Sequence, residues 1–126
     1  MKTIIAGSRE ITDYQQVLDA VSQCDWQITT VICGMARGVD TLGEQYAKEN
    51  SIPVEYFPAD WKTHGKSAGY LRNVEMAKNA EALIAIWDGK SRGTMHMINI
   101  ARDHNLRVFV YNSQRERDLF EITAQS

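Results

Sequence analysis

The sequence has few of the features that mark membrane, metal or redox proteins. No apolar stretch approaches the length of a membrane span. Only two cysteines occur, Cys24 and Cys33, and their spacing fits neither a metal site nor a redox pair. We expect Cys33 to be a buried thiol in a reduced, cytoplasmic protein, with a disulfide to Cys24 as the open alternative. Met1 leads directly into an apolar run, so no signal peptide is expected.

An excess of either charge is also lacking. The chain has 14 Lys and Arg against 16 Asp and Glu, which gives a net charge of −2. It therefore has no general attraction for nucleic acid or anionic membranes. Its cations are nevertheless uneven, since the turns after the expected strands hold Arg9, Arg37, Lys62, Lys66, Lys90 and Arg92. A mildly acidic protein with one cationic edge suits a small anion better than a polymer.

Several common motifs of catalytic and nucleotide sites are absent. The sequence has no Walker loop, no Cys/His group with zinc spacing and no Gly-x-Ser-x-Gly turn. The glycine spacing of a dinucleotide fingerprint is missing after the first apolar run. No metal and no bound cofactor are therefore expected.

What the chain does have is a regular alternation of apolar runs and helical segments. Its 126 residues suit one domain, residues 1–126. Strands are expected at residues 3–6, 29–33, 52–57, 82–87 and 107–111, and helices at 12–23, 39–50, 68–79 and 94–104. This order predicts an α/β, Rossmann-like three-layer sandwich whose five-stranded parallel sheet has the order 3-2-1-4-5.

Two further segments lie outside this alternation. Residues 58–67 form the longest loop, and the charged tail, residues 114–126, is expected to be either a docked helix or a frayed end. The predicted order places the switch point between the first and fourth strands. The turns at residues 7–9 and 88–94 are therefore expected to face each other.

Small-residue turns follow the expected strands, at residues 7–9, 34–38 and 88–94, and each holds an arginine. Glycines let the backbone approach a ligand closely. Helix N-termini and guanidinium groups favour negative charge. The pattern predicts a site for a small molecule that carries phosphate.

These three turns and the segment from Trp61 to Met76 form four motifs that occur in a fixed order along the chain. The motifs are Gly7-Ser8-Arg9, Gly34-x-Ala36-Arg37-Gly38-x-Asp40, Trp61…Gly65…Ala68-Gly69…Arg72-Asn73…Met76 and Asp88-Gly89-x-Ser91-x-Gly93-Thr94. Together they closely resemble the YspA/YpsA-related branch of the SLOG superfamily, which also includes the LOG phosphoribohydrolases and the DNA-processing protein DprA. The resemblance covers residues 2–111. It implies a Rossmann-like fold, a nucleotide or nucleotide-derived ligand and, together with the apolar residues of the tail, a homo-oligomer.

The candidate ligand-binding residues lie in or beside these motifs. They are Gly7, Ser8, Arg9, Gly34, Arg37, Gly38, Asp40, Trp61, Arg72, Asn73, Asp88, Ser91, Gly93 and Thr94. Gly93 and Thr94 match the Gly-Thr of the LOG signature, which implies phosphate binding. Arg72 stands in a place comparable to that of a LOG active-site arginine.

Some of these residues have a second interpretation. Asp40 is expected to cap a helix, with contact to a ribose or pairing to Arg37 as alternatives. Trp61 is expected to be either a packing anchor or a surface on which a base stacks. The hydroxyl and free N–H groups at Gly7 and Ser8 could hold phosphate or only form a tight turn.

The sequence departs from the LOG enzymes at one decisive position. Their catalytic glutamate, three residues after the threonine, corresponds to Met97, which cannot accept a proton. We therefore expect a binding module for a ligand such as ADP-ribose or NAD, acting as a sensor or sequestering protein. The alternative is an enzyme that cleaves an N-glycosidic bond of a nucleotide with Asp88 and Arg72 as catalytic residues. Single-stranded DNA binding, as in DprA, is disfavoured by the acidic balance.

Overall fold

The structure, a computed structural model, describes residues 1–113 of the chain. Strands and helices alternate along it as the sequence predicts. In order they are β1 (Lys2–Gly7), α1 (Tyr14–Gln23), β2 (Thr30–Cys33), α2 (Val39–Glu49), β3 (Val54–Tyr56), α3 (Trp61–His64), η1 (Gly65–Ser67), α4 (Ala68–Asn79), β4 (Ala82–Trp87), α5 (Arg92–Asp103) and β5 (Arg107–Asn112). The prediction for the tail, residues 114–126, lies outside the described residues.

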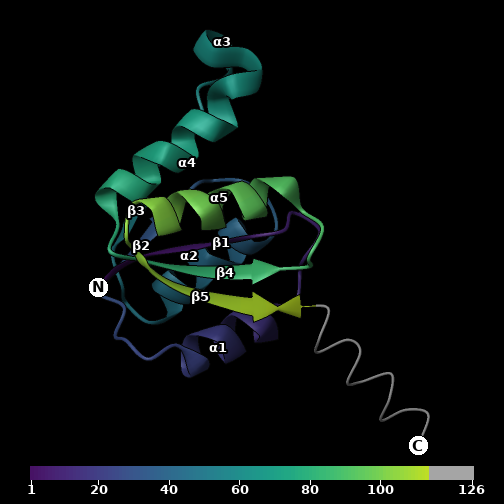
Figure 1. The fold of residues 1–126 in the computed structure, drawn as a ribbon. Helices are drawn as coiled ribbons and strands as arrows, with labels where there is room; N and C mark the ends of the chain where they lie inside the picture. Colours follow the sequence, from purple (N-terminus) through teal and green to yellow (C-terminus); the bar gives the residue numbers. More distant parts are fainter. Residues whose placement is uncertain (114–126) are drawn as a thin grey trace, which may run out of the picture.

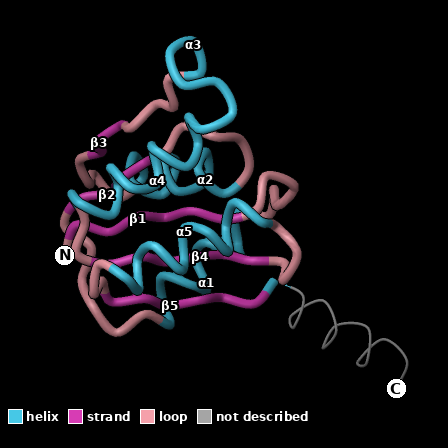
Figure 2. The backbone as a smooth tube through the Cα atoms, turned by 45° about the horizontal axis from the view of Figure 1, so that its top comes forward, coloured by secondary structure: helices cyan, strands magenta, loops and turns pink. Residues whose placement is uncertain are grey.

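The five strands form one parallel sheet in the order β3-β2-β1-β4-β5, which confirms the predicted fold and strand order. The central strand β1 pairs with β2 on one side and β4 on the other, so that Ile4 lies between Ile32 and Leu83. Helices α4 and α5 cover one face of the sheet, and α1 and α2 cover the other (Figure 1). Figure 2 shows the same layers from a second direction.

Alternation along the strands divides the core into two apolar clusters. Ile4 of β1 points toward α4 and α5, where Met76 and Met97 pack against it. The next residue, Ile5, points to the opposite face and packs with Val17 of α1 and its neighbours. Because β1 and β4 are buried on both faces, their residues form continuous apolar runs rather than an alternating pattern.

The helices differ from the expected ones most clearly in two places. The segment expected as a loop at residues 58–67 contains α3 and the short 3₁₀ helix η1, because Asp60 caps α3 by accepting the N–H of Thr63 at 3.1 Å. Figure 1 shows α3 standing away from the sheet. Helix α5 begins at Arg92, two residues earlier than expected, because the side chain of Ser91 caps it.

The described residues also answer two questions that the sequence raised. Cys24 and Cys33 are both free, and Cys33 is buried at the end of β2 as expected. Burial raises the pKa of the Cys33 thiol to about 11, which makes it a poor nucleophile. Within residues 1–113, no helix is long and apolar enough to cross a membrane.

Candidate functional site

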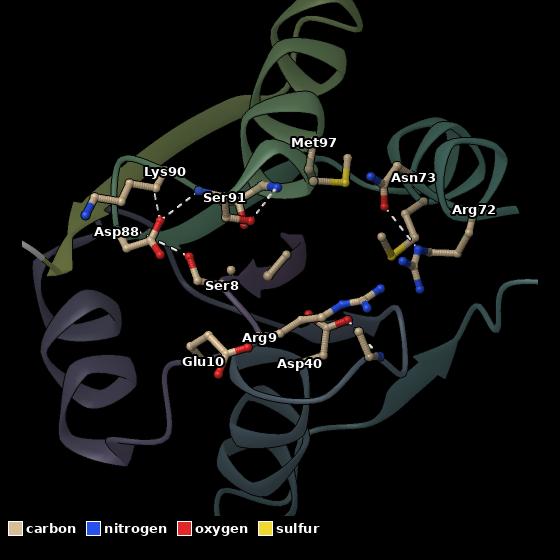
Figure 3. A pocket seen from close by; sticks show the side chains of 16 residues that line it. Ser8, Arg9, Glu10, Asp40, Arg72, Asn73, Asp88, Lys90, Ser91 and Met97 are labelled. Carbon is tan, nitrogen blue, oxygen red and sulfur yellow. Dashed lines mark hydrogen bonds between the residues drawn. The ribbon is translucent and has the colours of Figure 1, made fainter. Parts of the chain in front are cut away.

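A cavity of about 460 Å³ lies at the carboxyl ends of β1 and β4, where the strand order changes direction (Figure 3). We call it the central cavity. It is lined by Ala6, Gly7, Ser8, Arg9, Glu10, Ala36, Asp40, Arg72, Asn73, Met76, Asp88, Lys90, Ser91, Gly93, Thr94 and Met97. Both its position and its size are typical of ligand sites in open α/β proteins.

The turn after β1 is bound tightly to the turn after β4. A Cβ atom on Gly7 would lie 2.2 Å from the carbonyl oxygen of Ile86, so only glycine allows these strand ends to come together. Ser8 is buried, and its N–H donates to the same carbonyl at 3.2 Å. This N–H is therefore not free, contrary to the expectation that it could hold phosphate. The Ser8 hydroxyl accepts the N–H of Asp88 at 3.4 Å and so joins the two turns.

Asp88 shapes the turn that leads into α5. Its Oδ1 accepts the N–H groups of Lys90 and Ser91, each at 2.8 Å. Burial raises the pKa of Asp88, but these two N–H groups and the hydrogen bond with Ser8 together lower it by more, so the pKa lies below its ordinary value. Asp88 is thus an ionised carboxylate that fixes the turn.

The N-terminus of α5 faces the central cavity. The Oγ of Ser91 accepts the N–H of Thr94 at 3.3 Å and lies 3.0 Å from the Thr94 hydroxyl. An added Cβ on Gly93 would meet no atom within 4 Å, so the backbone here is open. The first turn of the helix can therefore approach an anion closely.

Asp40 lies buried beneath the loop that follows β2, with 5% of its surface exposed. Its Oδ2 accepts the N–H of Ala36 at 3.1 Å. Burial raises the pKa of Asp40 to about 6, against the opposing effects of the Ala36 N–H and the charges of Arg72 and Arg9. Its carboxylate binds an N–H before the helix rather than capping one in it, because the loop folds back over α2, whose N-cap is Gly38.

The pairing of Asp40 with Arg37 that the sequence left open does not occur. Arg37 instead pairs with Glu10 at 3.1 Å on the surface, where both side chains are largely exposed. Arg72 and Arg9 are the cations whose charges act on Asp40. Figure 3 shows the Arg9 side chain extending beside Asp40 toward Arg72.

Arg72, near the start of α4, is held by hydrogen bonds at two points. Its Nη1 donates to the carbonyl oxygen of Gly34, and its Nε donates to Oδ1 of Asn73 at 3.0 Å. A Cβ on Gly34 would lie 3.0 Å from this Nη1 and 2.9 Å from Oδ2 of Asp40. Gly34 is thus the residue that lets the guanidinium approach the loop. Burial lowers the pKa of Arg72, and the Asp40 charge opposes that change.

A second cavity, of about 590 Å³, opens beside the central one, and we call it the side cavity. It is lined by Arg9, Gly34, Met35, Ala36, Arg37, Pro58, Ala59, Trp61 and Arg72. Arg9, Ala36 and Arg72 line both cavities, which are therefore adjacent. Its lining includes large side chains that are exposed to solvent, since Met35 and Trp61 are 55% and 54% exposed.

The structure brings most of the predicted ligand-binding residues together. Those that line the central cavity are Gly7, Ser8, Arg9, Asp40, Arg72, Asn73, Asp88, Ser91, Gly93 and Thr94. Gly34, Arg37 and Trp61 lie in the side cavity. Gly38 lines neither of the two. Its φ of 74° and the 2.5 Å from an added Cβ to the Arg9 carbonyl oxygen show that it packs the loop against the first turn.

Sequence reasoning missed some of the residues that line the central cavity. Glu10 and Lys90 each adjoin a predicted residue in a turn, and that adjacency was the available signal. Met76 and Met97 are buried helix residues whose ends reach the cavity wall. Met97 therefore occupies the wall where the LOG resemblance implies a glutamate. Among the described residues, no group of three or more His, Cys, Asp or Glu side chains could hold a metal ion.

The fold and the central cavity define a Rossmann-like α/β protein with a candidate ligand site at the switch point of its sheet. Residues 1–64 match the family model YAcAr, described as the YspA, cpYpsA-related SLOG family. The Gene 61 protein of Mycobacterium phage D29 is 31% identical over 123 residues, covering 90% of this chain and 98% of that protein. No solved structure gives a significant match.

The chain belongs to the YspA, cpYpsA-related SLOG family, which confirms the resemblance found in its motifs. Membership in this family suggests nucleotide-related binding or a glycosidase-like function.

Proposed function

We propose that the chain binds a nucleotide or a nucleotide-derived phosphate ligand, such as ADP-ribose or NAD, and acts as a sensor or sequestering module. The observation that carries this proposal is the convergence of distant turns on one cavity at the switch point of the sheet. Ligands of open α/β sheets bind at this position.

The charges around the central cavity suit a phosphate group. The open backbone at Gly93 and the first turn of α5 would receive the phosphate, and Thr94 adds a hydroxyl. Arg9 and Arg72 would supply positive charge from the opposite wall. Asp40, buried beside them, limits the net positive charge of that wall and can accept a hydrogen bond from a ribose hydroxyl.

The adjacent side cavity supports a ligand larger than phosphate and ribose alone. Trp61 offers an exposed ring there, on which a base would stack. The residues shared by the two cavities mark the passage along which the ribose would lie. A phosphate at α5 and a base at Trp61 together fit a nucleotide rather than an inorganic anion.

The alternative function is cleavage of an N-glycosidic bond of a nucleotide, and one observation favours it. Asp88 is an ionised carboxylate in the cavity wall, and a carboxylate can stabilise an oxocarbenium-like transition state. Its lowered pKa makes it a weak base near neutral pH, and Met97 adds no acid or base. Binding without turnover is therefore the first proposal.

Incubation with AMP, NAD and ADP-ribose separates these functions. We expect the ligand to raise the Tm and to be recovered unchanged, because a ligand at 100 times its Kd adds about 2.7 kcal/mol of stability. Release of free base, detected by chromatography, would establish the enzyme instead. Salt-sensitive binding to an oligonucleotide without any effect of these small molecules would favour the third function, DNA binding.

Thr94→Val tests the position of the site. The variant keeps the shape of a buried side chain but removes its hydroxyl, and we expect about a tenfold loss of ADP-ribose affinity. Thr29→Val is the control for the same substitution far from the site, because Thr29 is an exposed residue just before β2, at the opposite ends of the strands. Equal affinities in the two variants, with both folded, would reject this site.

A further inference from the structure

A chain of hydrogen bonds runs from α5 through α4 to the loop after β2. Nδ1 of His96 lies 3.1 Å from Nδ2 of Asn73. Oδ1 of Asn73 accepts the Nε–H of Arg72 at 3.0 Å, and Nη1 of Arg72 donates to the carbonyl oxygen of Gly34. His96 itself does not line the central cavity, whereas Asn73 and Arg72 do.

The donor and acceptor groups of these side chains fix the direction of each hydrogen bond in the series. The Nε of Arg72 is always a donor, so it must face the oxygen of the Asn73 amide. The amide nitrogen of Asn73 then faces His96 and donates to it. Nδ1 of His96 must therefore be unprotonated, and the proton of the neutral ring lies on Nε2.

The His96 ring is held in a setting that favours its neutral form. Its Nε2 is buried and has no hydrogen-bond partner among the described residues. The Tyr70 ring of α4 packs on it with ring centroids 4.2 Å apart. Burial lowers the pKa of His96.

Among the described residues, no carboxylate offsets the effect of burial on the pKa of His96. From α4, the ionisable or charged groups facing His96 are Tyr70 and, through Asn73, Arg72. The strands beneath α5 present apolar residues such as Leu83 and Val108.

We propose that His96 is a positioning residue for Arg72, and that protonation of its Nδ1 releases the guanidinium from its bound orientation. A protonated Nδ1 becomes a donor, so the Asn73 amide must turn its oxygen toward His96. Its NH₂ group would then face the Nε–H of Arg72, and two donors cannot bond. Arg72 keeps only its bond to Gly34. This inference rests on the proposed function for its effect on a ligand, but the hydrogen-bond switch can be tested without one.

The direct test is NMR of the side-chain nitrogens during a pH titration. We expect neutral His96 to show the Nε2–H tautomer, and the Arg72 Nε–H signal to broaden or shift as His96 takes up a proton. The Nδ1–H tautomer at neutral pH would overturn the proposal. So would an Arg72 Nε–H signal that stays unchanged while His96 titrates.

The binding test uses ADP-ribose, whose pyrophosphate keeps its charge between about pH 5 and about pH 8. His96→Asn places an acceptor oxygen near the position of Nδ1 and cannot titrate there, whereas His96→Phe has no acceptor. We expect wild-type affinity to fall about tenfold relative to His96→Asn as the pH falls. His96→Phe should bind weakly at every pH. His104→Asn, a change at the exposed far end of α5, should keep the wild-type profile.

The comparison with His96→Asn removes the effect of Asp40. The pKa of Asp40 is about 6, so acid also removes the negative charge of Asp40 from the cavity. This change favours anion binding in every variant alike. Parallel pH profiles of the wild type and His96→Asn would overturn the positioning role. If none of AMP, NAD and ADP-ribose binds at any pH, the proposed function is wrong, and the NMR titration alone tests the hydrogen-bond switch.

Discussion

The central cavity and the side cavity lie next to each other, but they are built differently. In the central cavity the polar side chains of Ser8, Asp40, Asn73 and Thr94 are buried, and the first three of these bond to neighbouring segments of the protein. In the side cavity Met35, Arg37 and Trp61 are exposed, and Arg37 forms a surface ion pair with Glu10. We therefore expect the central cavity to be formed before any ligand arrives, and the exposed side chains of the side cavity to become ordered when a ligand binds.

This difference indicates how binding energy is divided. A group already held in position loses little conformational freedom when a ligand binds, so its interactions contribute most of their strength to affinity. An exposed side chain must be ordered on binding, and that cost offsets part of its contact. We therefore expect the central cavity to set affinity, and the side cavity to adjust selectivity for the base.

The largest expected difference is between two arginines. Arg72→Ala removes a guanidinium that is bonded to Gly34 and Asn73, and we expect the affinity for ADP-ribose to fall by about 2 to 3 kcal/mol. Arg37→Ala removes an exposed guanidinium in a surface ion pair, and we expect a change of less than about 1 kcal/mol. Isothermal titration calorimetry measures both.

Unfolding curves are the control for this pair. Both variants should remain folded, because the apolar clusters around the sheet contain neither arginine. Equal losses of affinity in the two variants would mean that the side cavity is as important as the central one, and the contrast between the cavities would fail.

The positions of the glycines and strand ends were accessible to sequence reasoning, whereas the bonds made by the polar side chains were not. The runs around Ile4 and Ile84 have the length and apolar continuity of buried parallel strands, and the strand order brings the turns after them together. The back-reaching bond from Asp40 to the Ala36 N–H depends on the path of a loop, which no local pattern specifies. The chain from His96 to Arg72 joins residues 24 positions apart on two helices, and it depends on their packing.

The two cavities also differ in how a nearby carboxylate makes stability depend on pH, and Asp40 is the buried case. Its folded pKa, about 6, is above the ordinary 3.8, so the folded state binds the proton more tightly. Its contribution to stability is therefore present in acid and lost as pH rises from about 4 to about 6. We expect Asp40→Asn to gain about 2 kcal/mol near pH 7.5 and nothing near pH 4. Denaturant unfolding at the two pH values checks this.

Asp60 is the matched control, because it caps α3 beside the side cavity with an exposed carboxylate. The Thr63 hydroxyl and N–H lower its pKa, so its stabilising contribution is present at neutral pH and lost in acid. Asp60→Asn should therefore change stability in the opposite direction, with a small loss at neutral pH. A gain from both substitutions at pH 7.5 would show that burial is not the cause of the Asp40 effect.

The smallest expected effect is at Trp61, and it decides what the side cavity contributes. Trp61 is 54% exposed, and even an added Cβ on Gly69 of α4 would lie 3.7 Å from its ring, so Trp61→Ala should leave the Tm nearly unchanged. Loss of a stacked base should lower the affinity for ADP-ribose by about 1 kcal/mol, while the affinity for inorganic pyrophosphate, which has no base, stays constant. Trp61→Phe, which keeps an aromatic face, should recover most of the ADP-ribose affinity. A fall in Tm with equal losses for both ligands would make Trp61 a packing anchor, and the side cavity would then have no part in recognising a base.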